Sequence, residues 1–212
     1  MAQNPFEFLR MVLGFRWRRS ELEDAATDAR KLQDRTELAS TLRTLGELER
    51  RTPFTQGAAL KHYEEEVAIF RELDDPLKLA HTIRHLGLAH EDAGRLEEAE
   101  QYYDEALALY REHETADTLD YANAVRYPAV IKNRLGKAEE SAKLWEEAHD
   151  RYAHVGIVDG VAESAGRLTL FALEKGDATL ARDWFAKASE ASEASSDQET
   201  HKFIAGVGAK LK

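Results

Sequence analysis

The sequence predicts an all-α protein, a right-handed α-solenoid of antiparallel helix hairpins with about 10–11 helices. The first observation is a short sequence that recurs along the chain, begins with alanine and contains an arginine, with its alanines 41, 42 and 40 residues apart: Ala39, Ala80, Ala122 and Ala162. The second is that only four prolines and twelve glycines interrupt the 212 residues, so long helices can form. The third is a composition of 43% hydrophobic and 33% charged residues, which is typical of a folded chain.

The composition also excludes or disfavours several classes of protein. The chain has no cysteine, which excludes disulfides, thiolate catalysis and cysteine zinc sites. Its net charge of −11 disfavours binding to nucleic acid or to anionic membranes. No stretch has the roughly 20 apolar residues of a membrane span, and Glu7 and Arg10 interrupt the apolar N-terminus, which differs from a signal peptide. We therefore expect a cytoplasmic protein.

Residues 1–35 are expected to form a degenerate N-terminal hairpin. Asn4-Pro5 opens a first helix over about 5–16, and the apolar spacing of Leu22, Ala26 and Ala29 predicts a second helix over 20–33. The first helix is apolar on nearly all sides, and one helix contact buries only one stripe. Its second face could cap the stack internally, self-associate or dock a partner, or contact a membrane surface beside the basic cluster that ends at Arg19.

The clearest repeat begins at Asp75-Pro76, where Asp75 can cap the first backbone N–H groups and proline at the first turn loses no hydrogen bond. One face of the predicted helix carries Leu79, Ile83 and Leu86, and Gly94 ends it. A second helix follows, whose inward face alternates small and aromatic residues: Ala99, Tyr103, Ala106 and Tyr110.

The same pattern recurs in the other repeats. The second helices align on small residues, Ala59, Ala99, Ser141 and Ala181, each followed four positions later by an aromatic residue, Tyr63, Tyr103, Trp145 and Phe185. The aromatic residues are expected in the core, and the breaks also align at Gly94, Gly136 and Gly176.

These residues, with the pair Leu86-Gly87, resemble the tetratricopeptide repeat family, in an extended form with repeats of 40–42 residues. The resemblance implies a single domain over residues 1–212, with four repeats over 36–193 and a C-terminal capping helix within 194–212. In that family the first helices of the repeats line a concave surface, and the resemblance implies the same surface here.

Arginine recurs on this surface at the repeat period, as Arg43, Arg84, Arg126 and Arg167. Exposed guanidinium groups offer paired donors to carboxylates, so we expect a groove that binds an acidic or C-terminal peptide segment of a protein partner. The alternative is that the arginines pair with acidic residues on a solvated face: Glu47, Glu91 and Asp92.

Neighbouring residues complete the expected contact surface: His81, His85, Leu88, Asn123 and Tyr127. Asn123 would hold the peptide backbone, and Tyr127 with Leu88 would receive an apolar side chain. His81 and His85 lie four residues apart, a spacing that could hold a metal ion, but no further ligands are evident and we expect no metal and no cofactor. Protonation of both would instead add positive charge below about pH 6.5.

Pro128 falls inside a predicted helix, where proline removes a hydrogen bond. It could kink the helix and widen the groove beside Tyr127, or the longer repeat could simply tolerate a bend.

The chain carries no glycine-rich phosphate loop, nucleophile elbow or metalloprotease motif, so we expect no enzymatic activity. The favoured function is a non-catalytic scaffold that binds a protein or peptide. The alternative is a structural module that dimerises through the apolar N-terminal helix. Nucleic-acid binding through the arginines is disfavoured by the acidic net charge.

Overall fold

The computed structural model describes residues 5–52, 55–114 and 116–211, apart from the side chains of residues 5–12 and 56. Within these ranges the chain forms ten α-helices and no strand, which confirms the all-α prediction. They are α1 (Pro5–Leu32), α2 (Arg35–Arg50), α3 (Gln56–Glu72), α4 (Pro76–Asp92), α5 (Leu96–His113), α6 (Leu119–Arg134), α7 (Ala138–His154), α8 (Val158–Glu174), α9 (Ala178–Glu193) and α10 (Gln198–Ala209). The chain forms two compact units, Met1–Tyr102 and Tyr103–Lys212, and its organisation as a single domain stays a prediction.

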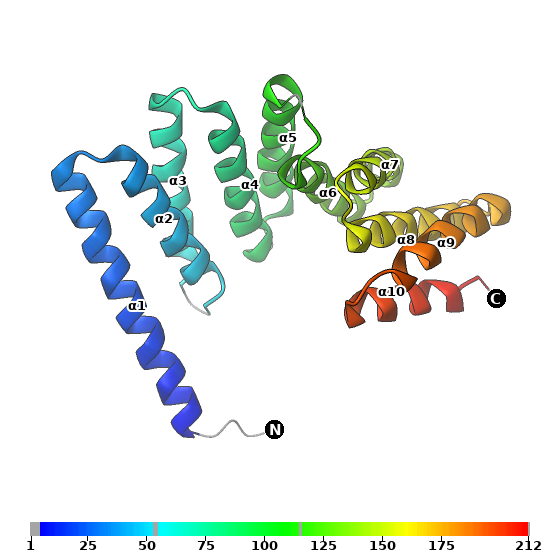
Figure 1. Ribbon diagram of the computed structural model, residues 1–212, viewed down its shortest axis with the longest axis horizontal. Coiled ribbons are helices and arrows are strands. Elements are labelled where there is room, and N and C mark those ends of the chain that lie inside the picture. Colours follow the sequence, from blue (N-terminus) through cyan, green and yellow to red (C-terminus); the bar gives the residue numbers. More distant parts are fainter. Residues whose placement is uncertain (1–4, 53–54, 115, 212) are drawn as a thin grey trace. The chain divides into compact units, whose positions relative to one another are not determined.

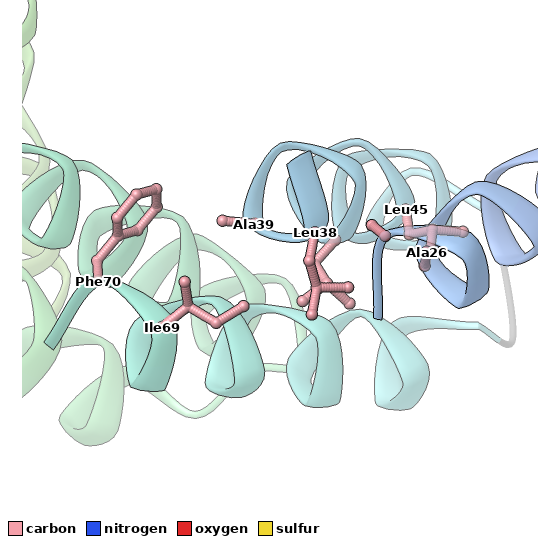
Figure 2. Packing of buried hydrophobic residues seen from close by; sticks show 8 residues of the cluster. Ala26, Leu38, Ala39, Leu45, Ile69 and Phe70 are labelled. Atoms are coloured by element: carbon pink, nitrogen blue, oxygen red, sulfur yellow. The ribbon is translucent and has the colours of Figure 1, made fainter. Parts of the chain in front are cut away.

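In unit 1, each helix packs against the next one in the chain, from α1 to α4 (Figure 1). Their apolar faces meet in one core cluster (Figure 2). In this cluster, Leu38, Leu42 and Leu45 of α2 are at most 2% exposed. Burying a leucine or isoleucine side chain contributes about 1.5–3 kcal/mol each, so this cluster holds the helices together. Its full set of buried residues is Ala26, Ala29, Leu38, Ala39, Leu42, Leu45, Ile69 and Phe70.

In unit 2, α6 packs on α7, α7 on α8 and α8 on α9, and α10 packs on both α8 and α9. Ile204 of α10 packs in one cluster with alanines of the two preceding helices, and Val207 of α10 is also buried. A helix near the C-terminus is expected from the sequence, and its role as a cap of the stack stays a prediction.

The helix ends follow the signals in the sequence. Asp75 accepts a hydrogen bond from the Lys78 N–H at 3.0 Å, with Pro76 in the first turn of α4. Side chains cap four other helices in the same way: Asp34, Thr118, Asp177 and Asp197. Four turns place glycine in the left-handed region at φ between +72° and +77°: Gly94, Gly136, Gly156 and Gly176. The predicted breaks are thus confirmed, and Gly156 adds one that the alignment of repeats misses.

The N-terminal hairpin is the clearest difference from the sequence analysis. Helix α1 runs without a break from Pro5 to Leu32, where two helices are expected over 5–16 and 20–33. The expectation is wrong because no proline or glycine interrupts residues 15–32, which are rich in good helix formers such as arginine, alanine, glutamate and leucine. In the part of the chain that the structure describes, no helix has the length and apolar character needed to cross a bilayer.

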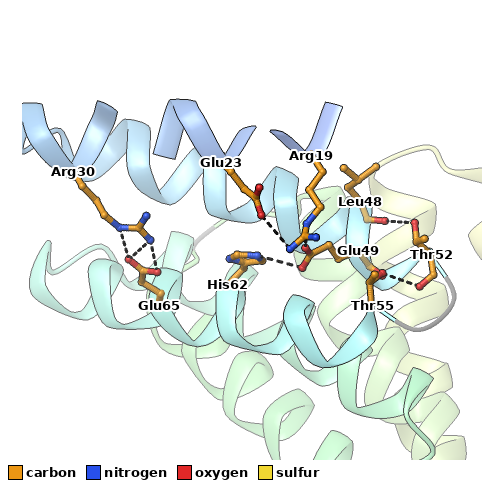
Figure 3. Close-up of polar contacts among 9 residues, drawn as sticks. All are labelled: Arg19, Glu23, Arg30, Leu48, Glu49, Thr52, Thr55, His62 and Glu65. Carbon is orange, nitrogen blue, oxygen red and sulfur yellow. Dashed lines mark hydrogen bonds and ion pairs between the residues drawn. The ribbon is translucent and has the colours of Figure 1, made fainter. Parts of the chain in front are cut away.

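Helix α1 is tied to α2 and α3 by polar contacts around Glu49, whose side chain is fully buried (Figure 3). Arg19 of α1 donates from Nε to the carboxylate of Glu49 at 2.8 Å, and His62 Nε2 of α3 lies 3.2 Å from the same carboxylate. Nearer the end of α1, Arg30 donates from Nη2 to both carboxylate oxygens of Glu65 of α3, at 2.7 and 2.8 Å. Arg19 therefore holds α1 against α2, and its guanidinium is bound within the protein.

The predicted aromatic core is confirmed at three of its four positions, because Tyr63, Tyr103 and Trp145 are at most 3% exposed. Phe185 is partly buried against the α8–α10 cluster. Pro128 is buried in α6, which continues through it from Leu119 to Arg134. Whether Pro128 kinks α6 and widens a groove stays a prediction.

The helices of a hairpin approach closely where glycine meets an aromatic ring. A Cβ atom on Gly46 of α2 would lie 2.6 Å from the Tyr63 ring of α3, closer than non-bonded carbons can lie. The same arrangement recurs in unit 2, where a Cβ on Gly160 of α8 would lie 2.4 Å from the Tyr152 ring. Glycine is required at both positions by space, although both backbones are ordinary helix.

We expect Gly46→Ala to lower the free energy of unfolding by about 1–3 kcal/mol, because the added methyl group must displace the buried Tyr63 ring or separate α2 from α3. The measurement is urea unfolding followed by circular dichroism. Gly57→Ala is the matched control, since a Cβ on this exposed glycine of α3 meets nothing within 4 Å. Equal stability of the two variants would contradict the close contact.

Candidate binding site

The predicted contact residues fall into two groups, one in each unit. Helices α2 and α4 of unit 1 carry the first group: Arg43, His81, Arg84, His85 and Leu88. Helices α6 and α8 of unit 2 carry the second group: Asn123, Arg126, Tyr127 and Arg167. The structure describes each group within its own unit, so a continuous groove that joins them stays a prediction.

In unit 1, the arginines are more engaged than the sequence analysis expects. Arg43 donates from Nε and Nη2 to one oxygen of Glu66 at 2.8 and 2.7 Å, and Glu66 is fully buried. Burial raises the pKa of Glu66, and the attraction of Arg43 opposes that rise. Arg84 is only 5% exposed, so the expectation of an exposed guanidinium is wrong at this position. Packing of α4 against its neighbours, which a single helix pattern does not encode, removes it from solvent.

The two histidines of α4 stack on each other, with ring centroids 4.6 Å apart, and His85 also faces the Tyr63 ring at 5.8 Å. Burial lowers the pKa of His85 to about 2, and nearby positive groups add to the effect: Arg84, His81, Arg43 and Arg50. The idea that His85 gains charge near pH 6.5 is therefore wrong. Among the described residues, no group of three or more His, Asp or Glu side chains is placed to hold a metal ion.

Unit 2 contains a pocket of about 470 Å³ between α6, α8 and α10, which we call the α10 pocket. Three predicted contact residues line it: Asn123, Arg126 and Arg167. Tyr127 does not; its ring stacks on Tyr103 at 5.3 Å instead. The remaining lining residues are Leu119, Tyr152, Ile157, Asp159, Gly160, Glu163, Asp197, Glu199, Thr200 and Phe203.

Glu163 of α8 holds both arginines of the pocket. Arg126 makes two hydrogen bonds to its carboxylate, at 2.7 and 3.2 Å, whereas Arg167 makes one at 3.4 Å. Burial alone would lower the pKa of Arg126, but the hydrogen bond and charge of Glu163 raise it. Arg126 is thus firmly bound, and Glu163 replaces the acidic partners that the sequence analysis considers for the arginines.

Arg167 is held more by aromatic rings than by its long contact with Glu163. Its guanidinium carbon lies 4.9 Å from the centre of the Phe203 ring and 5.9 Å from that of Trp145, within the range of cation–π attraction. Its Nε atom is buried and has no hydrogen-bond partner among the described residues. Since a guanidinium has five N–H donors, Arg167 keeps hydrogen-bonding capacity for a ligand.

The polar groups around Arg167 define which charges the pocket accepts. Asn123 accepts a hydrogen bond from the Tyr152 hydroxyl at 2.8 Å, which fixes the orientation of its amide. The four carboxylates of the pocket exceed the two arginines, so its formal charge is −2 at pH 7. Asp159 accepts from the Ser195 hydroxyl, and Asp197 accepts from the backbone and side chain of Thr200 at 2.9 and 2.8 Å. This negative formal charge disfavours a run of acidic residues in the pocket.

The sequence analysis misses the contribution of α10, because it treats that helix as a solvent-facing cap. Thr200 and Phe203 of α10 close one side of the pocket, together with its capping residue Asp197. No repeat pattern marks them, since α10 has no aligned partner in the other repeats. Their spacing of three residues on one helix face is the signal that could have grouped them.

We expect the imidazole of His85 to stay neutral from pH 8 to pH 4, because its pKa is lowered to about 2. The same group in the unfolded chain takes up a proton near pH 6.5, so His85 makes the fold less stable as the pH falls below that value. The measurement is an NMR titration of its ring signals, assigned with His85→Gln. Urea unfolding of the two proteins should diverge by up to about 1.4 kcal/mol per pH unit below pH 6.5. A ring that protonates between pH 6 and 7 would contradict the burial.

Comparison with known proteins supports this architecture. The family described as tetratricopeptide repeat matches residues 57–112. The RxLR effector protein SFI4 of Phytophthora infestans (strain T30-4) is 32% identical over 71 residues, a match that covers 34% of this chain and only 21% of that protein.

Solved structures extend the likeness to most of the chain. BtubC (BKLC) from P. vanneervenii has a TM-score of 0.77 at 18% identity, covering 92% of this chain and 84% of its own. The apo form of RapI has a TM-score of 0.79 at 15% identity, covering 93% and 54%. A Rap protein complexed with Competence and Sporulation Factor has a TM-score of 0.66 at 16% identity, covering 93% and 58%. Residues 57–112 thus match the tetratricopeptide repeat family, and the fold of the chain is an all-α solenoid of helical repeats like that of these structures.

Proposed function

We propose that this chain is a non-catalytic module that binds a segment of a partner protein, and that the α10 pocket receives the end of that segment. The observation that carries the proposal is Arg167, whose guanidinium lines a pocket of about 470 Å³ and keeps a buried donor without a partner among the described residues. The side chain of Arg167 is 38% exposed, and a hydrogen bond between a charged donor and a ligand carboxylate contributes about 1.5–3 kcal/mol.

The charges of the pocket favour a C-terminal carboxylate among the acidic and C-terminal segments that the arginines could bind. A single carboxylate can reach Arg167, whereas several would meet Asp159, Asp197 and Glu199. Arg126 supports the site by holding Glu163 in two hydrogen bonds, and Asn123 offers its amide N–H group to the ligand backbone. One structural neighbour is a Rap protein complexed with Competence and Sporulation Factor, so a protein of this fold can bind a partner factor.

The arginines of unit 1 have a smaller part in this proposal. Arg43 is bound to the buried Glu66, and Arg84 is buried. We propose that His81 and Leu88, which are both partly exposed on α4, give unit 1 a contact surface of its own for the partner protein. An affinity of order micromolar, about 8 kcal/mol, is expected for the α10 pocket.

We expect Arg167→Ala to weaken peptide binding about 10- to 100-fold, because the ligand carboxylate loses its charged donor. The probe is the peptide most enriched from a phage library of random 12-residue peptides with free C-termini, labelled at its N-terminus and measured by fluorescence anisotropy. Amidation of its C-terminus should weaken binding to a similar extent.

The matched control is Arg182→Ala, an arginine on the exposed face of α9 outside the pocket, which should bind within twofold of wild type. Circular dichroism melts verify that each variant folds. Equal affinity of the two variants, or a library from which no peptide is enriched, would contradict the proposal.

Self-association is a second candidate function, which the exposed side chains of α1 favour. Leu13 is 55% exposed and Trp17 is 66% exposed. Two large apolar side chains one turn apart on a helix form a stripe that a second copy of the chain could cover.

For this second function, we expect sedimentation velocity to show a mass that rises with protein concentration in wild type and stays monomeric in Trp17→Glu. Ala25→Glu is the control, since Ala25 is exposed on the same helix, two turns further along, and lies outside the stripe. A monomer at every concentration in the wild-type protein would rule out dimerisation through α1.

A further inference from the structure

A second hollow in unit 2 lies directly beside the α10 pocket. It has a volume of about 370 Å³ and runs between α8 and α10; we call it the α10 groove. It is lined by Leu170, Glu199, Lys202, Phe203, Gly206, Val207 and Lys210. The pocket and the groove share Phe203 and Glu199, so the two hollows adjoin at these residues.

The floor of the groove is apolar and its rim is basic. Leu170, Phe203 and Val207 supply the apolar surface, and Gly206 leaves the floor open because a Cβ there would meet nothing within 4 Å. Lys202 of α10 and Lys210, the C-cap residue that follows α10, are both exposed, and Lys202 lies 3.8 Å from the carboxylate of Glu199 in a loose ion pair. An apolar surface between two lysines suits an apolar side chain that has acidic neighbours.

We propose that the α10 groove binds the residues that precede the C-terminus of the same partner segment, an apolar side chain followed upstream by an acidic one. This inference rests on the proposed function of the α10 pocket and adds the sequence that the pocket selects. The C-terminal carboxylate lies at Arg167, the apolar side chain enters beside Phe203, and the acidic side chain meets Lys210. The capping helix α10 is then a recognition element as well as a cap.

The dimensions of the helix agree with a short segment. Phe203 of α10 and its C-cap residue Lys210 are seven residues apart, which corresponds to about 10 Å along the helix axis. Three extended residues span about the same distance, at about 3.3 Å each. Residues three or four positions apart on α8, such as Arg167 and Leu170, lie on one face, so the carboxylate site and the apolar floor are neighbours.

The test uses the peptide selected for the pocket and two groove variants. Gly206→Glu places a carboxylate on the groove floor, and the double variant Lys202→Glu/Lys210→Glu reverses the charge of the rim. Each is expected to weaken binding at least tenfold. Ala205→Glu is the matched control and should bind within twofold, since Ala205 is exposed on α10 and lines neither the groove nor the pocket. Replacing the acidic residue of the peptide by glutamine should remove the effect of the rim variant.

The outcomes separate this inference from the pocket proposal. If Arg167→Ala weakens binding and the groove variants bind as wild type does, the groove is not used and this inference is overturned while the pocket proposal stands. Normal binding by Arg167→Ala would overturn both. Self-association that Gly206→Glu abolishes would make a second copy the occupant of the groove, and would also overturn the inference.

Discussion

In each unit of this protein, a glycine of one helix lies against the tyrosine ring of a neighbouring helix. At Gly46 and Gly160 the helix backbone itself contacts the ring of a tyrosine, and one added methyl group would overlap it. An amphipathic hairpin buries only part of its apolar surface, so it is stable only when its neighbours cover the rest. The glycine and tyrosine contacts set the distance between helices, and that distance determines which charged side chains can reach one another.

The local features of the fold could be predicted from the sequence because they depend on residues close together in the chain. The cap at Asp75 and the left-handed turn at Gly94 need only their neighbours, and the apolar spacing gives the buried faces. The sequence analysis does not predict α1 as one helix. It expects a repeat in this region and therefore two helices, although residues 15–32 are rich in residues that favour a continuous helix. Ion-pair partners could not be predicted either: Glu66 and Glu163 are bound by arginines 23 and 37 residues away, and only the packing of separate helices brings them together.

The predicted contact residues show the same limit. Position in the repeat correctly groups Asn123, Arg126 and Arg167 around one pocket, but it assigns similar exposure to Arg84, which is buried. Arginines at one position of the repeat differ in what holds them: a buried carboxylate holds Arg43, and two aromatic rings hold Arg167. We propose that this difference separates structural arginines from those that bind a ligand. An arginine whose N–H groups already bind residues of the protein has few hydrogen-bond donors left for a ligand. The role of α10 escapes a repeat pattern because a terminal helix has no counterpart elsewhere in the chain.

The central claim is that a partner segment ends in the α10 pocket, and a crystal structure of the chain with the selected 12-residue peptide tests it most directly. We expect the C-terminal carboxylate within hydrogen-bond distance of the Arg167 guanidinium, and the preceding side chains over Phe203 and Gly206. A peptide bound on another surface, or one that enters the pocket with its carboxylate turned toward solvent, would contradict the claim.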